Sequence, residues 1–149
     1  MKIYLATDHA GFELKEKIKS YLQENGYEVE DCGAFILDKT DDYPDFIAKA
    51  AMGVAKNPNF KGIVFGKSGA GECIVANKIK KIRAALGFSE ENVNLAREHN
   101  DINVLSLGSM FVDDEMAKKL VDIFLQTKFT NEERHIRRIN KIKEIENQV

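Results

Sequence analysis

The segment GIVFGKSGAGECIVANK, residues 62 to 78, places residue types that bind and transform ligands between two apolar runs. Gly66, Gly69 and Gly71 let the backbone approach a ligand closely, while Ser68 and Glu72 add a hydroxyl and a carboxylate. Backbone N–H groups of such a turn, at the positive end of the helix that follows, converge on negative charge. The segment therefore predicts an anion-binding loop, and the plainer alternative is a tight turn without a ligand.

Spacing excludes two familiar nucleotide-binding motifs in this loop. A P-loop, GxxxxGK[ST], needs a glycine five residues before Gly66, where Lys61 stands. A dinucleotide fingerprint, GxGxxG, follows the first strand of its domain, whereas GxxGxG here follows the third expected strand. The predicted anion is therefore not held as a nucleotide phosphate in either of these ways.

Short β-rich runs alternate along the chain with longer segments of helical period. Strands are expected at residues 2–7, 27–32, 62–65, 83–88 and 104–108. Helices are expected at about 12–26, 45–56, 72–80, 89–99, 113–127 and 131–147, with Ser89 as an N-cap. Parallel neighbours require crossovers, which helices supply, so the alternation predicts an α/β fold: a five-stranded parallel sheet with helices on both faces.

Composition limits the organisation and the partners of the chain. With 149 residues, 44% of them hydrophobic, we expect a single domain over residues 1–149. The 22 Lys and Arg against 24 Asp and Glu show no basic excess, so we expect no nucleic-acid partner. No 18 consecutive apolar residues and no signal-like N-terminus occur, which predicts a cytoplasmic protein without a membrane partner. The cysteines and histidines lack the spacing of a metal site, so we expect no metal.

In open parallel sheets, ligands bind where the strands end, and polar residues follow four of the expected strands. They are Asp8-His9 after the first strand, the glycine loop after the third, Ser89 with a helix ending in His99-Asn100-Asp101 after the fourth, and Gly108-Ser109 after the fifth. We therefore expect the site to gather from these segments, with Arg134, Arg137 and Arg138 of the C-terminal segment as further candidates.

Six blocks in order resemble the ribose-5-phosphate isomerase type B family, which also includes the galactose-6-phosphate isomerase subunits. The blocks are TDHAGFELK (7–15), DYPDF (42–46), GKSGAGECIVANK (66–78), IRAAL (82–86), REHNDINVLSLGS (97–109) and ERHIRRI (133–139). The resemblance implies a three-layer Rossmann-like domain and an aldose–ketose isomerase that needs neither a metal nor a cofactor. It also implies a sugar phosphate as substrate and a homodimer or dimer of dimers.

Glu72 is the expected base of that reaction, because it stands where the glycine loop enters its helix. Many members of the family carry a cysteine base at the position of Gly66, while others resemble this chain in having GxSGxGE. Cys73 is a rival, but adjacent helical residues point about 100° apart, so we expect a buried, inert thiol. The helix dipole alone would lower the pKa of Glu72, and burial would have to offset this. A mere dipole-complementing role is the alternative for Glu72.

The resemblance assigns roles to the remaining candidates. Charge on the enediolate is expected to fall on N–H groups around Ser68, Gly69, Ala70 and Gly71, with the catalytic Ser68 hydroxyl nearby. His99 would open the sugar ring, and Asp8 and Tyr43 would line the sugar. Arg134 and Arg138, four residues apart on one helical face, would bind the phosphate with His9. In the family, the histidine and asparagine at His99 and Asn100 come from the dimer partner, so sites would be shared between subunits.

The sequence is compatible with several alternatives. Met110 stands where many members have a phosphate-binding arginine, so another sugar phosphate (galactose 6-phosphate, allose 6-phosphate or a tetrose phosphate) is an alternative substrate. A non-catalytic sugar-phosphate sensor could lack a base, yet Glu72 is present. A receiver-type signalling domain would need a lone aspartate after the third strand, where the glycine loop stands. The helix at about 131–147 carries isoleucines every three residues and is expected at or near the dimer interface, or else over its own core.

Overall fold

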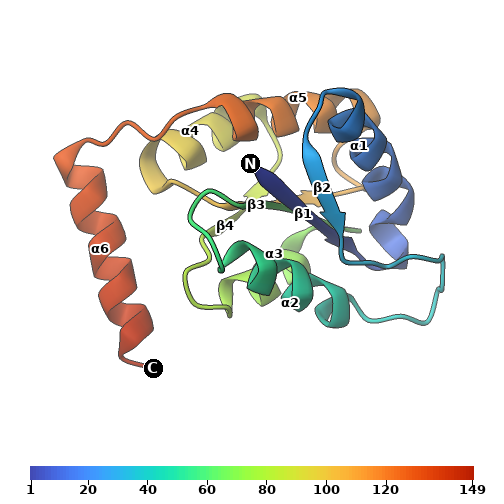
Figure 1. Ribbon diagram of the computed structural model, residues 1–149, viewed down its shortest axis with the longest axis horizontal. Coiled ribbons are helices and arrows are strands. Elements are labelled where there is room, and N and C mark those ends of the chain that lie inside the picture. Colours follow the sequence, from blue (N-terminus) through green and yellow to red (C-terminus); the bar gives the residue numbers. More distant parts are fainter.

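The computed structural model describes all 149 residues and contains one five-stranded parallel sheet (Figure 1). The strand order is β2-β1-β3-β5-β4, and every neighbouring pair is parallel. The strands are β1 (Lys2–Thr7), β2 (Glu28–Asp31), β3 (Lys61–Gly66), β4 (Ala84–Gly87) and β5 (Val104–Gly108). The predicted α/β class and the five parallel strands are confirmed.

Six α-helices and one short 3₁₀ helix connect and follow the strands. They are η1 (His9–Gly11), α1 (Phe12–Glu24), α2 (Tyr43–Val54), α3 (Ala70–Asn77), α4 (Glu90–Asn100), α5 (Asp114–Gln126) and α6 (Glu133–Asn147). The Ser89 side chain accepts a hydrogen bond from the Asn92 N–H at 3.1 Å, as expected of an N-cap. The helix expected to run to residue 80 ends at Asn77 instead, because the Asn77 amide pairs with both backbone groups of Ala84 and turns the chain into β4.

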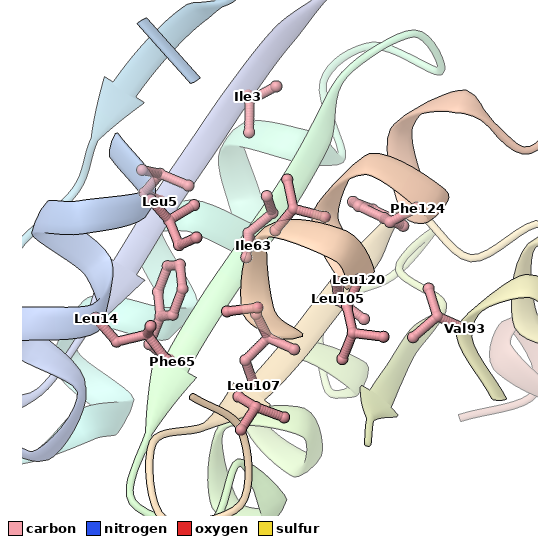
Figure 2. Close-up of a cluster of buried hydrophobic side chains, with 14 of the residues drawn as sticks. Ile3, Leu5, Leu14, Ile63, Phe65, Val93, Leu105, Leu107, Leu120 and Phe124 are labelled. Atoms are coloured by element: carbon pink, nitrogen blue, oxygen red, sulfur yellow. The ribbon is translucent and has the colours of Figure 1, made fainter. Parts of the chain in front are cut away.

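Both faces of the sheet are covered, which explains why the three central strands β1, β3 and β5 are nearly continuous apolar runs. Helices α1, α4 and α5 pack on one face, where Phe65 and Leu105 meet Leu14 and Phe124 (Figure 2). Helices α2 and α3 pack on the other face. Alternate residues of each strand serve the two faces. Full burial of a side chain as large as Phe65 stabilises the fold by roughly 1.5–3 kcal/mol.

Helix α6 stands apart from the layered body of the molecule (Figure 1). Only His135 and Ile139 of this helix are buried. Ile142 and Ile145 are 46% and 64% exposed, so the apolar stripe is not covered by its own chain beyond Ile139. No helix in the structure combines the length and the apolar character needed to cross a membrane.

Candidate active site at the carboxyl edge of the sheet

The glycine loop after β3 is held in place by the segment that follows β5. The Ser109 N–H donates to the Gly66 carbonyl at 2.8 Å, and the Met110 N–H donates to the Lys67 carbonyl at 3.0 Å. Gly69 caps α3 with φ +82°, a left-handed conformation that favours glycine, and its carbonyl accepts from the Ser106 hydroxyl at 2.7 Å. The loop is therefore fixed at the N-terminus of α3, the end of a helix that favours negative charge.

Glu72 lies in the first turn of α3 and is 4% exposed. Its carboxylate occupies the space over Gly66: a Cβ on Gly66 would lie 2.6 Å from Glu72 Oε2 and closer still to Oε1. Burial raises the pKa of Glu72, its own backbone N–H acts in the opposite direction, and the nearby Asp8 raises it further. The net direction of the pKa is upward without any ligand, so burial outweighs the lowering by the backbone N–H at the start of the helix. A raised pKa brings the carboxyl closer to the range useful for a general base.

Cys73 faces away from the glycine loop. Its Sγ donates to the Ala84 carbonyl at 3.5 Å and accepts from the Asn77 amide at 3.7 Å, both on the side of β4. Burial, with a contribution from Glu72, raises the pKa of this thiol, so it stays protonated and poorly nucleophilic at neutral pH. The side chains of Cys73 and Glu72 therefore point in different directions, as expected. The Cys73 thiol is only partly buried, whereas a buried thiol was expected.

Tyr43 and Ser68 lie at the same loop. Tyr43 begins α2, and a Cβ on Gly71 would lie 2.6 Å from its Cζ and 2.7 Å from its hydroxyl oxygen. The phenol therefore stands over the backbone at Gly71. The Ser68 hydroxyl accepts a hydrogen bond from the Ala70 N–H at 3.2 Å. The Ala70 N–H, one of the expected donors to the oxyanion, therefore already has a partner in the ligand-free chain. A ligand oxygen that binds at Ala70 would have to replace that contact.

Asp8 and His9 follow β1 at the same edge. The buried Asp8 caps η1 by accepting from the Ala10 N–H at 3.0 Å. His9 donates twice to a single oxygen, Asp41 Oδ1: from its backbone N–H at 3.0 Å and from Nδ1 at 2.7 Å. The Ser109 hydroxyl donates to the Ala10 carbonyl at 2.9 Å, which brings the segment after β5 beside η1. A cavity of about 620 Å³, lined by His9 and Ser109 among others, opens here.

Asp41 was not among the residues expected from the sequence. It lies 32 positions from His9 in an acidic loop, and nothing in that loop's composition marks one aspartate above the others. Asp8, His9 and Asp41 are the one group of metal-ligand residue types whose donor atoms lie within 4.8 Å of one another. Within the chain, Asp8 Oδ1 accepts from Ala10 and Asp41 Oδ1 accepts from His9, whereas Asp41 Oδ2 is buried without a hydrogen-bond partner.

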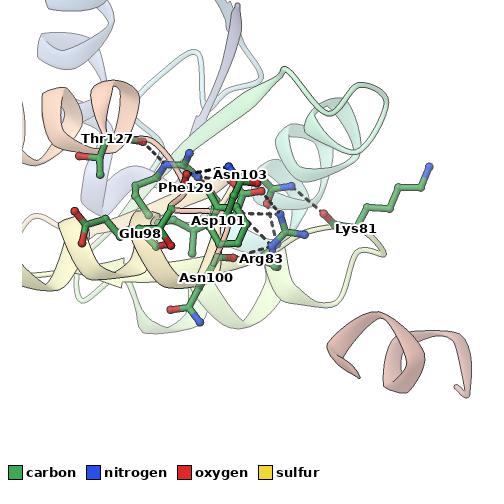
Figure 3. Close-up of polar contacts among 12 residues, drawn as sticks. Lys81, Arg83, Glu98, Asn100, Asp101, Asn103, Thr127 and Phe129 are labelled. Carbon is green, nitrogen blue, oxygen red and sulfur yellow. Dashed lines mark hydrogen bonds and ion pairs between the residues drawn. The ribbon is translucent and has the colours of Figure 1, made fainter. Parts of the chain in front are cut away.

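The other expected residues, His99, Asn100, Arg134 and Arg138, lie away from this edge. Helix α4 runs back from β4, and the residues after it reach the amino ends of the strands: the Asn103 carbonyl accepts from the Gly62 N–H at 2.9 Å. Figure 3 shows this network, in which Arg83 Nε, just before β4, donates to the Asn100 carbonyl at 3.0 Å. The expectation that the end of this helix gathers at the carboxyl ends of its own chain's strands is therefore wrong, because a crossover helix returns the chain to the amino edge.

His99 has a close neighbour that the sequence did not single out. Its ring stacks on that of His135 from α6, with centroids 4.3 Å apart and planes inclined by 16°. Burial, then His99, lowers the pKa of His135. Arg134 and Arg138 are exposed on the same helix, and Arg134 Nε pairs with Glu132 at 2.9 Å. One chain thus holds the expected base, the glycine loop and His9 at one edge, and the expected ring-opening histidine and phosphate-binding arginines at the other.

Comparison with known proteins identifies the family. A family model described as Ribose/Galactose Isomerase matches residues 3–142. The chain belongs to the ribose/galactose isomerase family. Within this family, ribose-5-phosphate isomerase B of Mycolicibacterium paratuberculosis is 44% identical, over 98% of this chain and 92% of the relative. The counterpart from Mycobacterium tuberculosis (strain H37Rv) is 42% identical, over 98% of this chain and 90% of the relative.

Solved structures of this family have the same fold. Ribose-5-phosphate isomerase B from Mycoplasma genitalium, with bound ribulose-5-phosphate, matches with a TM-score of 0.95 and 42% identity, covering 99% of this chain and 97% of that chain. The Clostridium thermocellum ribose-5-phosphate isomerase B matches with a TM-score of 0.93 and 40% identity, covering 99% of both chains. The family resemblance and the Rossmann-like fold that it implied are confirmed.

Proposed function

We propose that the protein is an aldose–ketose isomerase that interconverts ribose 5-phosphate and ribulose 5-phosphate. The observation that carries the proposal is the match, over 99% of this chain, to the Mycoplasma genitalium isomerase that holds ribulose-5-phosphate. The buried Glu72 beside the glycine loop supplies the base that this reaction requires. Because the reaction moves a proton and an electron pair within one molecule, it needs no redox cofactor.

The chemistry follows from Glu72 and the loop. Glu72 removes the proton from C2 of the open-chain aldose, and the C2–H electron pair forms the C1–C2 double bond while O1 takes the negative charge. N–H groups between Ser68 and Gly71 receive this charge. The O2 proton then passes to O1, the electron pair on O2 forms the C2 carbonyl, and the carboxylic acid returns its proton to C1 as the C1–C2 double bond reverts to a single bond, which gives the ketose. The raised pKa of Glu72 suits both the removal and the return of the proton.

We further propose that two chains complete each site. His99 of a second chain would open the sugar ring, with Asn100 beside it, and Arg134 and Arg138 of that chain would bind the phosphate together with His9. Two features support this: the four residues assigned to the second chain lie at the opposite sheet edge from Glu72, and the apolar stripe of α6 is not covered by its own chain beyond Ile139. A two-fold symmetric dimer, alone or as half of a tetramer, would supply two equivalent sites through this one contact.

The setting of the reaction is also part of the proposal. We place the protein in the cytoplasm as a single domain over residues 1–149, where Cys32 and Cys73 remain reduced. A second candidate substrate is a different sugar phosphate. Met110 favours this alternative. It is 61% exposed in the segment after β5 that holds the glycine loop. It has no charge with which to bind a phosphate, whereas many members of the family have an arginine at this position.

Turnover of purified, chelator-treated protein tests the proposal directly. Ribose 5-phosphate, allose 6-phosphate, galactose 6-phosphate and erythrose 4-phosphate are compared by kcat/KM, with Glu72→Gln as the matched inactive control. We expect ribose 5-phosphate to be preferred and Glu72→Gln to lose activity on it. A higher kcat/KM for a hexose or tetrose phosphate would mean that this sugar, and not ribose 5-phosphate, is the preferred substrate. No turnover of any of the four sugars would contradict the proposal that the protein is an aldose–ketose isomerase.

A further inference from the structure

His9 is held by Asp41 in an unusual way, through two hydrogen bonds to the same oxygen. The backbone N–H and Nδ1 of His9 both donate to Asp41 Oδ1, at 3.0 and 2.7 Å. The Asp41 side chain is only 9% exposed, whereas that of His9 is 34% exposed. With Nδ1 bonded to Asp41, Nε2 is the ring nitrogen left for a ligand, and it makes no hydrogen bond within the chain. Asp41 thus lies beneath His9 and fixes both its backbone and its ring.

The surroundings of His9 are acidic from every side. The charged groups near it are Asp8, Asp38 and Asp41 from the two loops, Glu13 and Lys17 from α1, and Asp113, Asp114 and Glu115 at the start of α5. The one cation among them, Lys17, pairs with Asp114 at 2.7 Å. Within its own chain, a positive His9 is therefore the one unpaired cation that this region could offer to a sugar phosphate, beside the arginines proposed from the second chain. The hydrogen bond to Asp41 is the main cause that raises the pKa of His9, burial opposes it, and Asp8 adds to the increase.

We propose that Asp41 is a positioning residue that keeps His9 as an imidazolium, with Nε2 free to donate to the substrate phosphate. The identity of the ligand rests on the proposed function, whereas the His9–Asp41 pair does not. A purely structural role would be different: Asp41 would only tie its loop to η1 through the His9 backbone N–H. The two roles predict different pH dependences of phosphate binding, because only the positioning of a charged His9 requires the charge of Asp41.

Asp41→Asn tests the charge while keeping an oxygen that can accept from the His9 backbone. The matched control is Asp42→Asn, which removes the same charge from an exposed neighbour whose side chain makes no hydrogen bond. Titration of the ligand-free proteins by NMR, with the His9 signal identified by its loss in His9→Gln, should give a His9 pKa above the ordinary ~6.5 in wild type and in Asp42→Asn. In Asp41→Asn we expect that pKa to fall.

Kinetics should then follow the charge of His9. A cation is present below its pKa and lost above it, so Asp41→Asn should match the wild-type KM for ribose 5-phosphate at a pH below both measured His9 pKa values and exceed it, by up to ~10-fold, at a pH between them. We expect kcat to change much less, and Asp41→Glu to restore part of the affinity at pH 8. Binding of inorganic phosphate, followed by the His9 signal, should weaken over the same pH range in Asp41→Asn.

Several results would overturn the proposal. An unchanged His9 titration in Asp41→Asn would show that the pair does not set the charge, and a KM increase of equal size at every pH would indicate the structural role. If the His9 pKa falls while KM and phosphate binding stay constant, His9 charge does not serve the phosphate. If the wild-type protein turns over no sugar phosphate, the proposed function fails, while the NMR and phosphate titrations still decide the role of Asp41.

Discussion

Replacing Gly66 with alanine should inactivate the enzyme by displacing its base. A methyl group at Gly66 would lie 2.6 Å from Glu72 Oε2, and closer to Oε1, whereas unstrained contacts need about 3.5 Å. The backbone of Gly66 cannot retreat freely, because it pairs with β5 and its carbonyl accepts from Ser109. The carboxylate must therefore move by at least about 1 Å, and a misplacement of 1 Å can already lower the rate by ~10²-fold, or about 2.7 kcal/mol of transition-state stabilisation.

The assay compares initial rates on ribose 5-phosphate for wild type, Gly66→Ala and the control Gly62→Ala. Gly62 lies in the same strand, and a Cβ there would meet only the Cγ2 atoms of Val54 and Val104 within about 3 Å, at 3.0 and 3.2 Å. We expect Gly62→Ala to lose some thermal stability but to keep kcat, and Gly66→Ala to stay folded with a large loss of kcat. A folded Gly66→Ala with activity within about threefold of wild type would refute the reasoning.

The lack of space over Gly66 also concerns the two bases found in the family, which are a cysteine at the position of Gly66 in many members and a glutamate at the position of Glu72 in others. A cysteine at the position of Gly66 would place its Cβ and Sγ in the volume that the Glu72 carboxylate fills here. The two bases therefore exclude each other in this backbone. Glycine at position 66 leaves room for the carboxylate of Glu72, the base that we propose.

Three further predictions concern the base, the shared site and the phosphate. Glu72→Gln should lower turnover by at least ~10²-fold. Because the pKa of Glu72 is raised in the folded protein, ionisation of this carboxyl destabilises the fold as pH rises. The variant should therefore have a higher melting temperature than wild type at pH 8, and the difference should disappear at acidic pH. Equal melting temperatures at pH 8 would contradict the burial argument. Mixing Glu72→Gln with His99→Ala after dissociation should restore about a quarter of wild-type activity, and none despite proven subunit exchange would exclude a shared site. Arg134→Ala or Arg138→Ala should raise KM for ribose 5-phosphate several-fold and reduce kcat less, and unchanged KM in both would leave these side chains as ordinary surface charges.

The sheet and the glycine loop were predictable because local signals determine them. Each of β1, β3 and β5 is a short apolar run followed by glycine or a polar residue, and the periodic segments between them allow parallel pairing only. The position of Glu72 followed from the helix that begins beside it. The direction of α4 was also inferable from the crossover rule, although the polar residues at its end suggested otherwise.

Asp41 and His135 could not be found in this way, because their roles arise from contacts between distant segments. Asp41 meets His9 only after the long loop past β2 folds back over η1. His135 stacks on His99 only because α6 returns to the end of α4. In a single sequence, the first is one of several loop aspartates and the second is one residue of a charged helix.

The separation of Glu72 and His99 at opposite sheet edges has a consequence for reaction order. If two chains complete each site, an isolated chain contains no complete active site and is inactive. Far below the dissociation constant of the dimer, the number of assembled sites grows with the square of the chain concentration, and far above it the growth is linear. The catalysed rate is then second order in chain when the protein is scarce and first order when it is abundant, so scarcity lowers the output of each molecule as well as the number of molecules.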